Sequence, residues 1–432
     1  MKLGIDNIKL PESKKRGPLG SLDHVKELGL SGIFFSTALD MSPTLDIGEL
    51  REIRAKADEL GLYLESGVGK INPYCSAEEP VLRAAGDGDI ILGFTRMIEA
   101  SAAIGCFELW VAPGNFKSEY RGRLANDRFR TDITWEDQLI GIEKVLQKLA
   151  PVARAHGAHL NIETHDEITS FEILRLIEKV GPDCVGAVFD TANGLQRAEH
   201  PVFAAKRLAP FVRQTHIKDA YVGRAPGGLD FQTRPVGGGI VDFATILPIL
   251  ADANPALNLS LEVAASVIDK PRKANPRQCI EIDDPIWRAG HPDLDAEELD
   301  AYMALVDAYG TRVASDHVPD WEAYEARQYG YPTYEHQSYG FDEAIAFIRQ
   351  SAGHIEAICK DKGIALNSAV SSKKSGLIAP DDGGFGRLAS PAFSGNIELR
   401  TNILMEKIMV HRYRICHGVQ HVPDAVAEPG EE

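Results

Sequence analysis

The strongest constraint on the fold is a set of four short apolar runs between residues 159 and 264. Each run ends at a polar residue of a type that binds metals, and a helix-like segment precedes each one. Short aliphatic or β-branched runs of this kind are typical of buried parallel strands. The four runs are His159–His165, Val185–Asn193, Val212–Asp219 and Leu257–Val263.

Strand-like and helix-like segments alternate eight times before residue 264, which predicts a (β/α)8 TIM barrel over residues 1–264. The alternative is an open, doubly wound sheet. No glycine-rich phosphate motif follows the first expected strand, which weighs against a dinucleotide-binding fold. The first four strands are expected at Lys2–Asp6, Gly32–Thr37, Leu62–Gly67 and Phe107–Gly114.

Capping signals mark several helices between the strands. Gly61 is expected to end a helix over Ile47–Leu60, and Thr169 with Glu172 forms a capping box that opens a helix to Val180. We expect further helices at Ser21–Gly29, Thr134–His156, Pro201–Leu208 and Asp242–Ala253. We expect long loops at Asn115–Ile133, over the barrel mouth, and at Gly223–Gly239.

Ligand-type residues stand at the ends of the last four strands. In a (β/α)8 barrel the loops after the strands carry the chemistry, so charged residues there are functional candidates. Any one of them alone could be a helix cap or a surface charge, but four in successive units favour a shared site. Three carboxylates and one imidazole suit Mn²⁺ or Mg²⁺, with Zn²⁺ or Co²⁺ as alternatives. The four residues are Glu163, Asp190, His216 and Glu262.

The composition bounds the possible partners and the cellular compartment. A net charge of −17 argues against nucleic acid as a partner, because such binding requires Lys and Arg to neutralise phosphates. The six cysteines lack CxxC spacing and indicate free thiols in a reducing cytoplasm. We expect no signal peptide, and no apolar run approaches the length of a membrane span.

The chain beyond the predicted barrel is less regular. We expect residues 265–362 to form an insertion and closing helices packed on the barrel, with helices at Asp295–Tyr309 and Gly340–Lys360. The aromatic segment Trp321–Tyr339 would cover the site or contact another subunit. Residues 363–432 should be an irregular, partly disordered extension.

Four motif-like stretches stand at the strand ends: Ile162-Glu-Thr-His165, Phe189-Asp-Thr-Ala-Asn193, His216-Ile-Lys-Asp219 and Ser260-Leu-Glu-Val263. Together they resemble the xylose-isomerase-like TIM-barrel family over roughly residues 1–264. That family includes sugar isomerases and epimerases, inosose and dehydroshikimate dehydratases, ketose-acid decarboxylases and endonuclease-IV-type enzymes. The resemblance implies that the matching Glu, Asp, His and Glu bind one divalent metal, and that the two glutamates exchange the substrate proton. It also implies a homo-oligomer.

Other candidates follow from the alternation of side chains along a strand and from the same resemblance. Alternation places His165 on the face of Glu163 and Lys218 on the face of His216, so both are candidate catalytic residues. Three further residues are candidates for substrate binding: Arg234, Asn193 and Glu65. In the ketose-3-epimerase branch, a His stands where this chain has Asn193 and an Arg where it has Val222.

The leading hypothesis is a divalent-metal-dependent isomerase or epimerase that acts on a small sugar or ketose derivative through a metal-stabilised enediolate. The alternative is a lyase on the same scaffold. It would be a 3-oxo sugar-acid decarboxylase, such as the 3-oxoisoapionate decarboxylase type, or an inosose-type dehydratase. An abasic-site nuclease and a non-catalytic barrel are weaker alternatives. In the leading case the partner is a small sugar or sugar-acid substrate.

Overall fold

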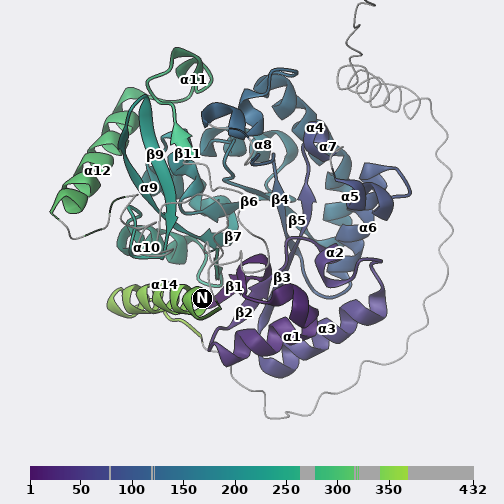
Figure 1. Cartoon of the computed structure of the whole chain (residues 1–432). Coiled ribbons are helices and arrows are strands. Elements are labelled where there is room, and N and C mark those ends of the chain that lie inside the picture. The colour runs from purple at the N-terminus through teal and green to yellow at the C-terminus, as the bar shows by residue number, and fades with distance from the viewer. Residues whose placement is uncertain are drawn as a thin grey trace, which may run out of the picture. The chain divides into compact units, whose positions relative to one another are not determined.

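Eight parallel strands form a closed barrel in the order β1-β10-β7-β6-β5-β4-β3-β2 (Figure 1). The computed structural model describes residues 1–76, 79–117, 120, 122–262, 278–315, 318, 320 and 341–367. Pairing of β1 with β10 closes the barrel, and the predicted TIM barrel is therefore confirmed over the open sheet. The strands are β1 (Lys2–Asp6), β2 (Gly32–Phe34), β3 (Tyr63–Lys70), β4 (Glu108–Ala112), β5 (His159–Glu163), β6 (Val185–Asp190), β7 (Val212–Ile217) and β10 (Asn258–Leu261).

Helices surround the strands, and their ends follow the capping residues of the sequence. Thr169 and Glu172 form the predicted capping box of α8, and Gly61 ends α3 in the left-handed conformation. The helices are α1 (Ser13–Glu27), α2 (Ala38–Met41), α3 (Ile47–Leu60), α4 (Pro73–Ser76), α5 (Pro80–Ala85), α6 (Ile90–Ala102), α7 (Trp135–His156), α8 (Ser170–Val180), α9 (Pro201–Leu208), α10 (Phe243–Ala253), α11 (Pro285–Ala289), α12 (Ala296–Ala314) and α14 (Phe341–Asp361).

The prediction of a loop at Gly223–Gly239 is wrong for most of these residues. It forms a β-hairpin of β8 (Asp219–Ala225) and β9 (Gly228–Arg234), which β11 (Gln278–Ile280) extends to three antiparallel strands. Pro226 and Gly227 make the two-residue turn, and Gly227 has the positive φ of 85° that this turn requires. The turn residues were visible in the sequence, but the pairing of the flanking segments was not.

Two other predicted boundaries also changed. The first helix begins at Ser13 rather than Ser21, because a short helical piece precedes a kink at Gly17 and Pro18. Within the predicted loop Asn115–Ile133, the described residues include two short 3-10 helices, η2 (Gly122–Ala125) and η3 (Asp127–Phe129).

The barrel interior contains a hydrogen-bonded polar layer as well as apolar side chains. The Tyr63 hydroxyl lies 2.8 Å from Ser260 Oγ, and Asn161 Nδ2 donates to Gln214 Oε1 over 3.1 Å. These side chains come from β3, β10, β5 and β7, and neither bond joins neighbouring strands. Their mutual bonds satisfy polar groups that would otherwise be costly to bury.

The rest of the described chain packs around this core. The α14 helix packs against α10 and β10, and the Met1 amino group donates to the carbonyls of Pro255 and Ala365. None of the helices in the described part of the chain combines the length and the hydropathy that crossing a bilayer requires. The cysteines in that part are free thiols.

Several predictions fall on residues outside the described ranges. They concern the aromatic segment Trp321–Tyr339, Cys416 and the extension beyond Asn367. The chain divides into residues 1–373 and 374–432, and the second unit lies wholly outside the described residues. The domain boundaries expected at residues 264 and 362 stay a prediction.

Candidate metal and active site

The four predicted ligand residues converge at the carboxyl-terminal ends of four neighbouring strands. Each offers one ligand-type atom, and these atoms all lie within 4.8 Å of one another. Their strands, β5, β6, β7 and β10, are adjacent in the barrel. The four residues are Glu163 at the end of β5, Asp190 at the end of β6, His216 near the end of β7 and Glu262 directly after β10.

His216 lies at the centre of the cluster. Its Nδ1 is 2.9 Å from Glu163 Oε1 and 3.4 Å from Glu262 Oε2. Its Nε2 is buried and has no hydrogen-bond partner among the described residues. The Phe34 ring packs edge-on against the imidazole, with 4.9 Å between the ring centroids. One nitrogen of the imidazole therefore has no hydrogen bond within the described part of the chain. Against the effect of burial, Glu163 and Glu262 raise the pKa of His216 to about 9, so a metal bound at this ring would displace a proton.

Two lysines supply positive charge to the same carboxylates. Lys218 Nζ lies 3.1 Å from Asp190 Oδ2 and 3.0 Å from Glu262 Oε2. Lys9 Nζ lies 3.2 Å from the other oxygen of Glu262, Oε1. Lys218 also donates to Asn193 Oδ1 over 3.0 Å. The structure thus brings the predicted Lys218 and Asn193 into the cluster, and adds Lys9.

Burial and opposite charges act against each other on the carboxyls of the site. Burial raises the pKa of Asp190 to about 7, although the Lys218 ammonium opposes this effect. Burial acts in the same direction on Glu163, but positive charge on His216 and His165 outweighs it and lowers the Glu163 pKa to about 2. Glu163 is therefore held ionised, while Asp190 titrates near neutrality.

Hydrogen bonds fix the orientation of two of the carboxylates. Trp110 Nε1 donates to Glu163 Oε2 over 2.8 Å, and Asn193 Nδ2 donates to Glu163 Oε1 over 3.4 Å. Asp190 Oδ1 accepts the backbone N–H groups of Ala192 and Asn193, both over 2.8 Å. These bonds leave Asp190 Oδ2 for the centre of the cluster. Such outer partners orient a ligand before a metal binds.

His165 lies beside the cluster and is paired with a neighbouring carboxylate. Its Nδ1 is 2.7 Å from Oε2 of the fully buried Glu167, and the side chain remains 18% exposed. Arg128 donates to the Glu167 carbonyl and also forms a salt bridge with Glu172, which anchors this loop. The exposed part of the imidazole leaves it able to meet a bound molecule.

Two other predicted substrate-binding residues are held by hydrogen bonds within the protein. Glu65 Oε1 accepts a 2.7 Å hydrogen bond from Asn258 Nδ2, and Asn258 is the first residue of β10, at the opposite end of that strand from Glu262. Arg234 is 1% exposed and donates to Gln232 Oε1 and to the Asp320 carbonyl. Arg234 is held by the hairpin and Asp320. Glu65, in contrast, interacts with His216 of the cluster, whose positive charge opposes the rise of the Glu65 pKa that burial causes. The substrate-binding roles of both residues stay predictions.

Sequence reasoning missed Lys9, Phe34 and Glu167. A partial signal existed for Lys9, which stands three residues after the end of β1, and for Phe34, which ends β2. In a closed barrel those ends meet the same mouth as β5 to β7. The pairing of Glu167 with His165 depends on the loop conformation, which residue spacing does not specify.

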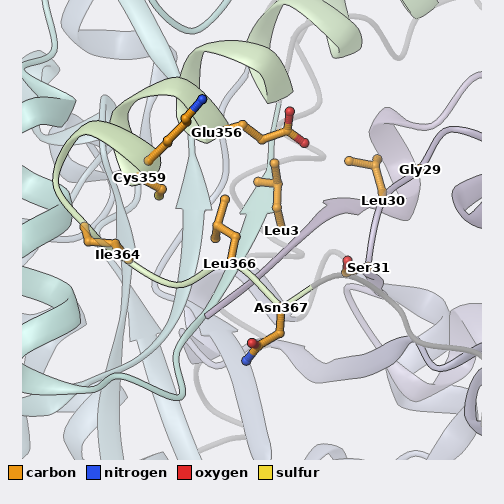
Figure 2. Close-up of a pocket in the computed structure, with 10 residues that line it drawn as sticks. Leu3, Gly29, Leu30, Ser31, Glu356, Cys359, Ile364, Leu366 and Asn367 are labelled. Atoms are coloured by element: carbon orange, nitrogen blue, oxygen red, sulfur yellow. The ribbon is translucent and has the colours of Figure 1, made fainter.

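A separate cavity of about 340 Å³ lies at the opposite end of the barrel, where the strands begin (Figure 2). Leu3 of β1 and Leu30 before β2 line one side, and Cys359 of α14, Ile364 and Leu366 line the other. None of these side chains belongs to the carboxylate cluster, so this cavity is distinct from the candidate site.

Comparison with known proteins finds one relative over a short stretch and several solved structures. The uncharacterized protein YihM of Escherichia coli strain K12 is 35% identical over 91 residues, which are 21% of this chain and 28% of that relative. The match therefore spans less than a third of that relative's length. Two solved structures align more widely. The 3-keto-D-glucoside 4-epimerase YcjR of E. coli is 18% identical and covers 61% of this chain and 92% of its own, with a TM-score of 0.46. A D-psicose 3-epimerase of Clostridium cellulolyticum H10 is 17% identical and covers 72% of this chain and 99% of its own, with a TM-score of 0.47.

A family model supplies the broader match. The model describes the xylose isomerase-like TIM barrel and matches residues 22–282, which is more than half of the chain. This span contains all four residues of the carboxylate cluster and most of the closed barrel. The chain belongs to the xylose isomerase-like TIM-barrel family.

Proposed function

We propose that this protein is a divalent-metal-dependent isomerase or epimerase of a small sugar or ketose derivative. The observation that carries the proposal is the convergence of Glu163, Asp190, His216 and Glu262 within 4.8 Å at the mouth of the barrel. Clusters at this end of a (β/α)8 barrel are where such enzymes do their chemistry.

The residues fit a divalent cation. Three carboxylates and one imidazole offer hard oxygen donors with a single nitrogen, and the buried Nε2 of His216 has no hydrogen-bond partner among the described residues. This donor set favours Mn²⁺, with Mg²⁺, Co²⁺ and Zn²⁺ as alternatives. Trp110, which donates to Glu163, would act as the outer partner that fixes one ligand.

The side chains around the cluster can move and stabilise charge. When bound, the cation supplies Lewis acidity to a substrate carbonyl and the adjacent hydroxyl, which weakens the neighbouring C–H bond. Glu163 and Glu262 approach from β5 and β10 on either side of His216, so one carboxylate can take a proton from carbon while the other returns one. Lys218 can donate a hydrogen bond to a developing oxyanion.

A lyase is the second candidate, and the two lysines at Glu262 favour it. Lys9 and Lys218 contact different oxygens of this carboxylate and present two ammonium groups at one side of the cluster. Such a pair suits a substrate carboxylate. On this basis the substrate would be a 3-oxo sugar acid that loses CO₂. An inosose that loses water, the other lyase alternative, has no carboxylate and is not favoured by this pair.

Proton NMR in D₂O tests both candidates with one preparation. The protein is stripped of metal, reconstituted with Mn²⁺ and incubated with a panel of ketoses, 3-oxo sugars and sugar acids. An isomerase or epimerase incorporates deuterium into an intact carbon skeleton, whereas a lyase releases CO₂ or water. We expect Glu163→Gln to lower the rate by about 100-fold or more. We expect Glu178→Gln, on the exposed face of α8, to behave like the wild type.

Two outcomes would contradict the proposal. If turnover continues after all metal has been chelated, the reaction does not need a metal. If protein shown to contain metal gave neither deuterium incorporation nor lyase products with any compound of the panel, the proposed reaction classes would be wrong. Analytical ultracentrifugation of the same preparation tests the expected homo-oligomer.

A further inference from the structure

The turn that follows β9 closes around a buried carboxylate. Asp219 is fully buried, and its Oδ2 accepts the backbone N–H groups of Gly237 and Gly239, both over 2.9 Å. Its Oδ1 accepts the N–H of Val241 over 3.1 Å and that of its neighbour Ala220 over 2.9 Å. Three donors of one short turn therefore converge on a single carboxyl group. Burial raises the pKa of Asp219 to about 7, against the effect of these backbone hydrogen bonds, so the group is ionised above about pH 7.

The glycine at position 239 is explained by this carboxylate. A Cβ added at Gly239 would lie 2.1 Å from Asp219 Oδ1 and 2.4 Å from the Ala220 carbonyl oxygen, so a side chain there would displace the anion. The turn is fixed from outside as well, because the Tyr309 hydroxyl donates to the Gly238 carbonyl over 3.0 Å. The backbone is thus held in a conformation that directs its N–H groups at Asp219.

The position of this turn in the barrel gives the arrangement a functional meaning. It lies in the connection between β7 and β10, the seventh and eighth strands of the barrel. Glycine-rich backbone at the loops after these two strands is where (β/α)8 enzymes frequently bind phosphate, through N–H groups that converge on the anion. Here the protein supplies that anion itself.

We infer that Asp219 is an internal anion that occupies the place, in the loop after the seventh strand, where other (β/α)8 enzymes bind a phosphate; we call this arrangement the filled cradle. The substrate is accordingly a sugar derivative that places no phosphate group at this turn. A phosphate at the same place would find its N–H donors already bonded, and above about pH 7 it would also face a carboxylate of like charge. The statement about the substrate deepens the proposed function and rests on it. The statement about the filled cradle rests on the contacts of Asp219 alone.

Inorganic phosphate is the probe that tests the filled cradle without any turnover. Binding is followed by ³¹P line width and by the amide signals of protein labelled with ¹⁵N-glycine, in which Gly237 and Gly239 report on the turn itself. We expect no saturable shift of these two amides in the wild type. We expect Asp219→Ala to bind phosphate at the turn at least about tenfold more tightly, or roughly 1.4 kcal/mol. Asp252→Asn, an exposed change in α10, is the matched control.

A second variant and a second assay keep the inference open to refutation. If Asp219→Ala does not fold, Asp219→Ser removes the charge and shortens the side chain, so that the turn is emptied, and it is expected to gain phosphate binding as well. Saturable shifts of Gly237 and Gly239 in the wild type, or a folded variant without any gain, would overturn the filled cradle. Tighter binding of a ketose phosphate than of the free ketose by the wild type would overturn the substrate class. Failure of every sugar to react, with the phosphate results as expected, would instead count against the proposed function.

Discussion

Glu65 provides a test of how the buried charges of the barrel set its stability. Burial raises the pKa of this carboxyl from 4.5 to about 7, against the hydrogen bond that it accepts from Asn258. Between these two pH values the folded protein keeps a proton on Glu65 that the unfolded chain has lost. The free energy of unfolding therefore falls as the pH rises from about 4.5 to about 7. The difference between the two pKa values corresponds to about 3 kcal/mol, at roughly 1.4 kcal/mol per pKa unit.

Glu65→Gln should remove this dependence, because the amide has nearly the same shape and does not ionise. Its oxygen can still accept from Asn258. We expect equal stability of variant and wild type near pH 4.5 and a more stable variant near pH 8, by up to about 3 kcal/mol. Urea unfolding at a series of pH values, at fixed ionic strength, measures the difference.

The matched control is Glu52→Gln on the exposed face of α3, which should leave the pH dependence unchanged. Parallel curves for Glu65→Gln and the wild type across the pH series would refute the reasoning. So would a variant that is less stable near pH 8. Either result would mean that the Glu65 carboxylate is well solvated or paired in the folded protein.

Three further changes test other parts of the structure. Arg128→Met leaves the buried Glu172 without its salt bridge, and we expect a loss of about 3–5 kcal/mol in urea unfolding. Thr169→Ala removes the N-cap of α8 and should cost about 1 kcal/mol in the same assay; no change would mean that the cap is redundant. Trp110→Phe removes the donor to Glu163 and should weaken Mn²⁺ binding by about tenfold in calorimetry, whereas an unchanged affinity would exclude Trp110 as an outer partner.

The barrel could be predicted because its signals are local and repeated. Each strand is a short apolar run, and residues such as Thr169, Gly61 and Asp242 mark helix ends through bonds within a few positions. Eight repeats of one unit then leave few topologies to choose from. The pairing of β9 with β11 was beyond the reach of local patterns, because the two strands lie some 45 residues apart in the chain.

The candidate site was predictable to the extent that strand ends determine it. Barrel closure alone carries Glu163 and Asp190 to a common rim, because every parallel strand delivers its last residue to the same edge. Charge is harder to assign from sequence. Arg234 seemed available to an acidic substrate, yet it is buried and donates to Gln232 and a backbone carbonyl. Lys9 belongs to no recognisable motif, yet its ammonium group contacts Glu262 of the cluster. The sequence shows how many Lys and Arg side chains the chain contains. Which of them reach the mouth of the barrel depends on how the strands pair.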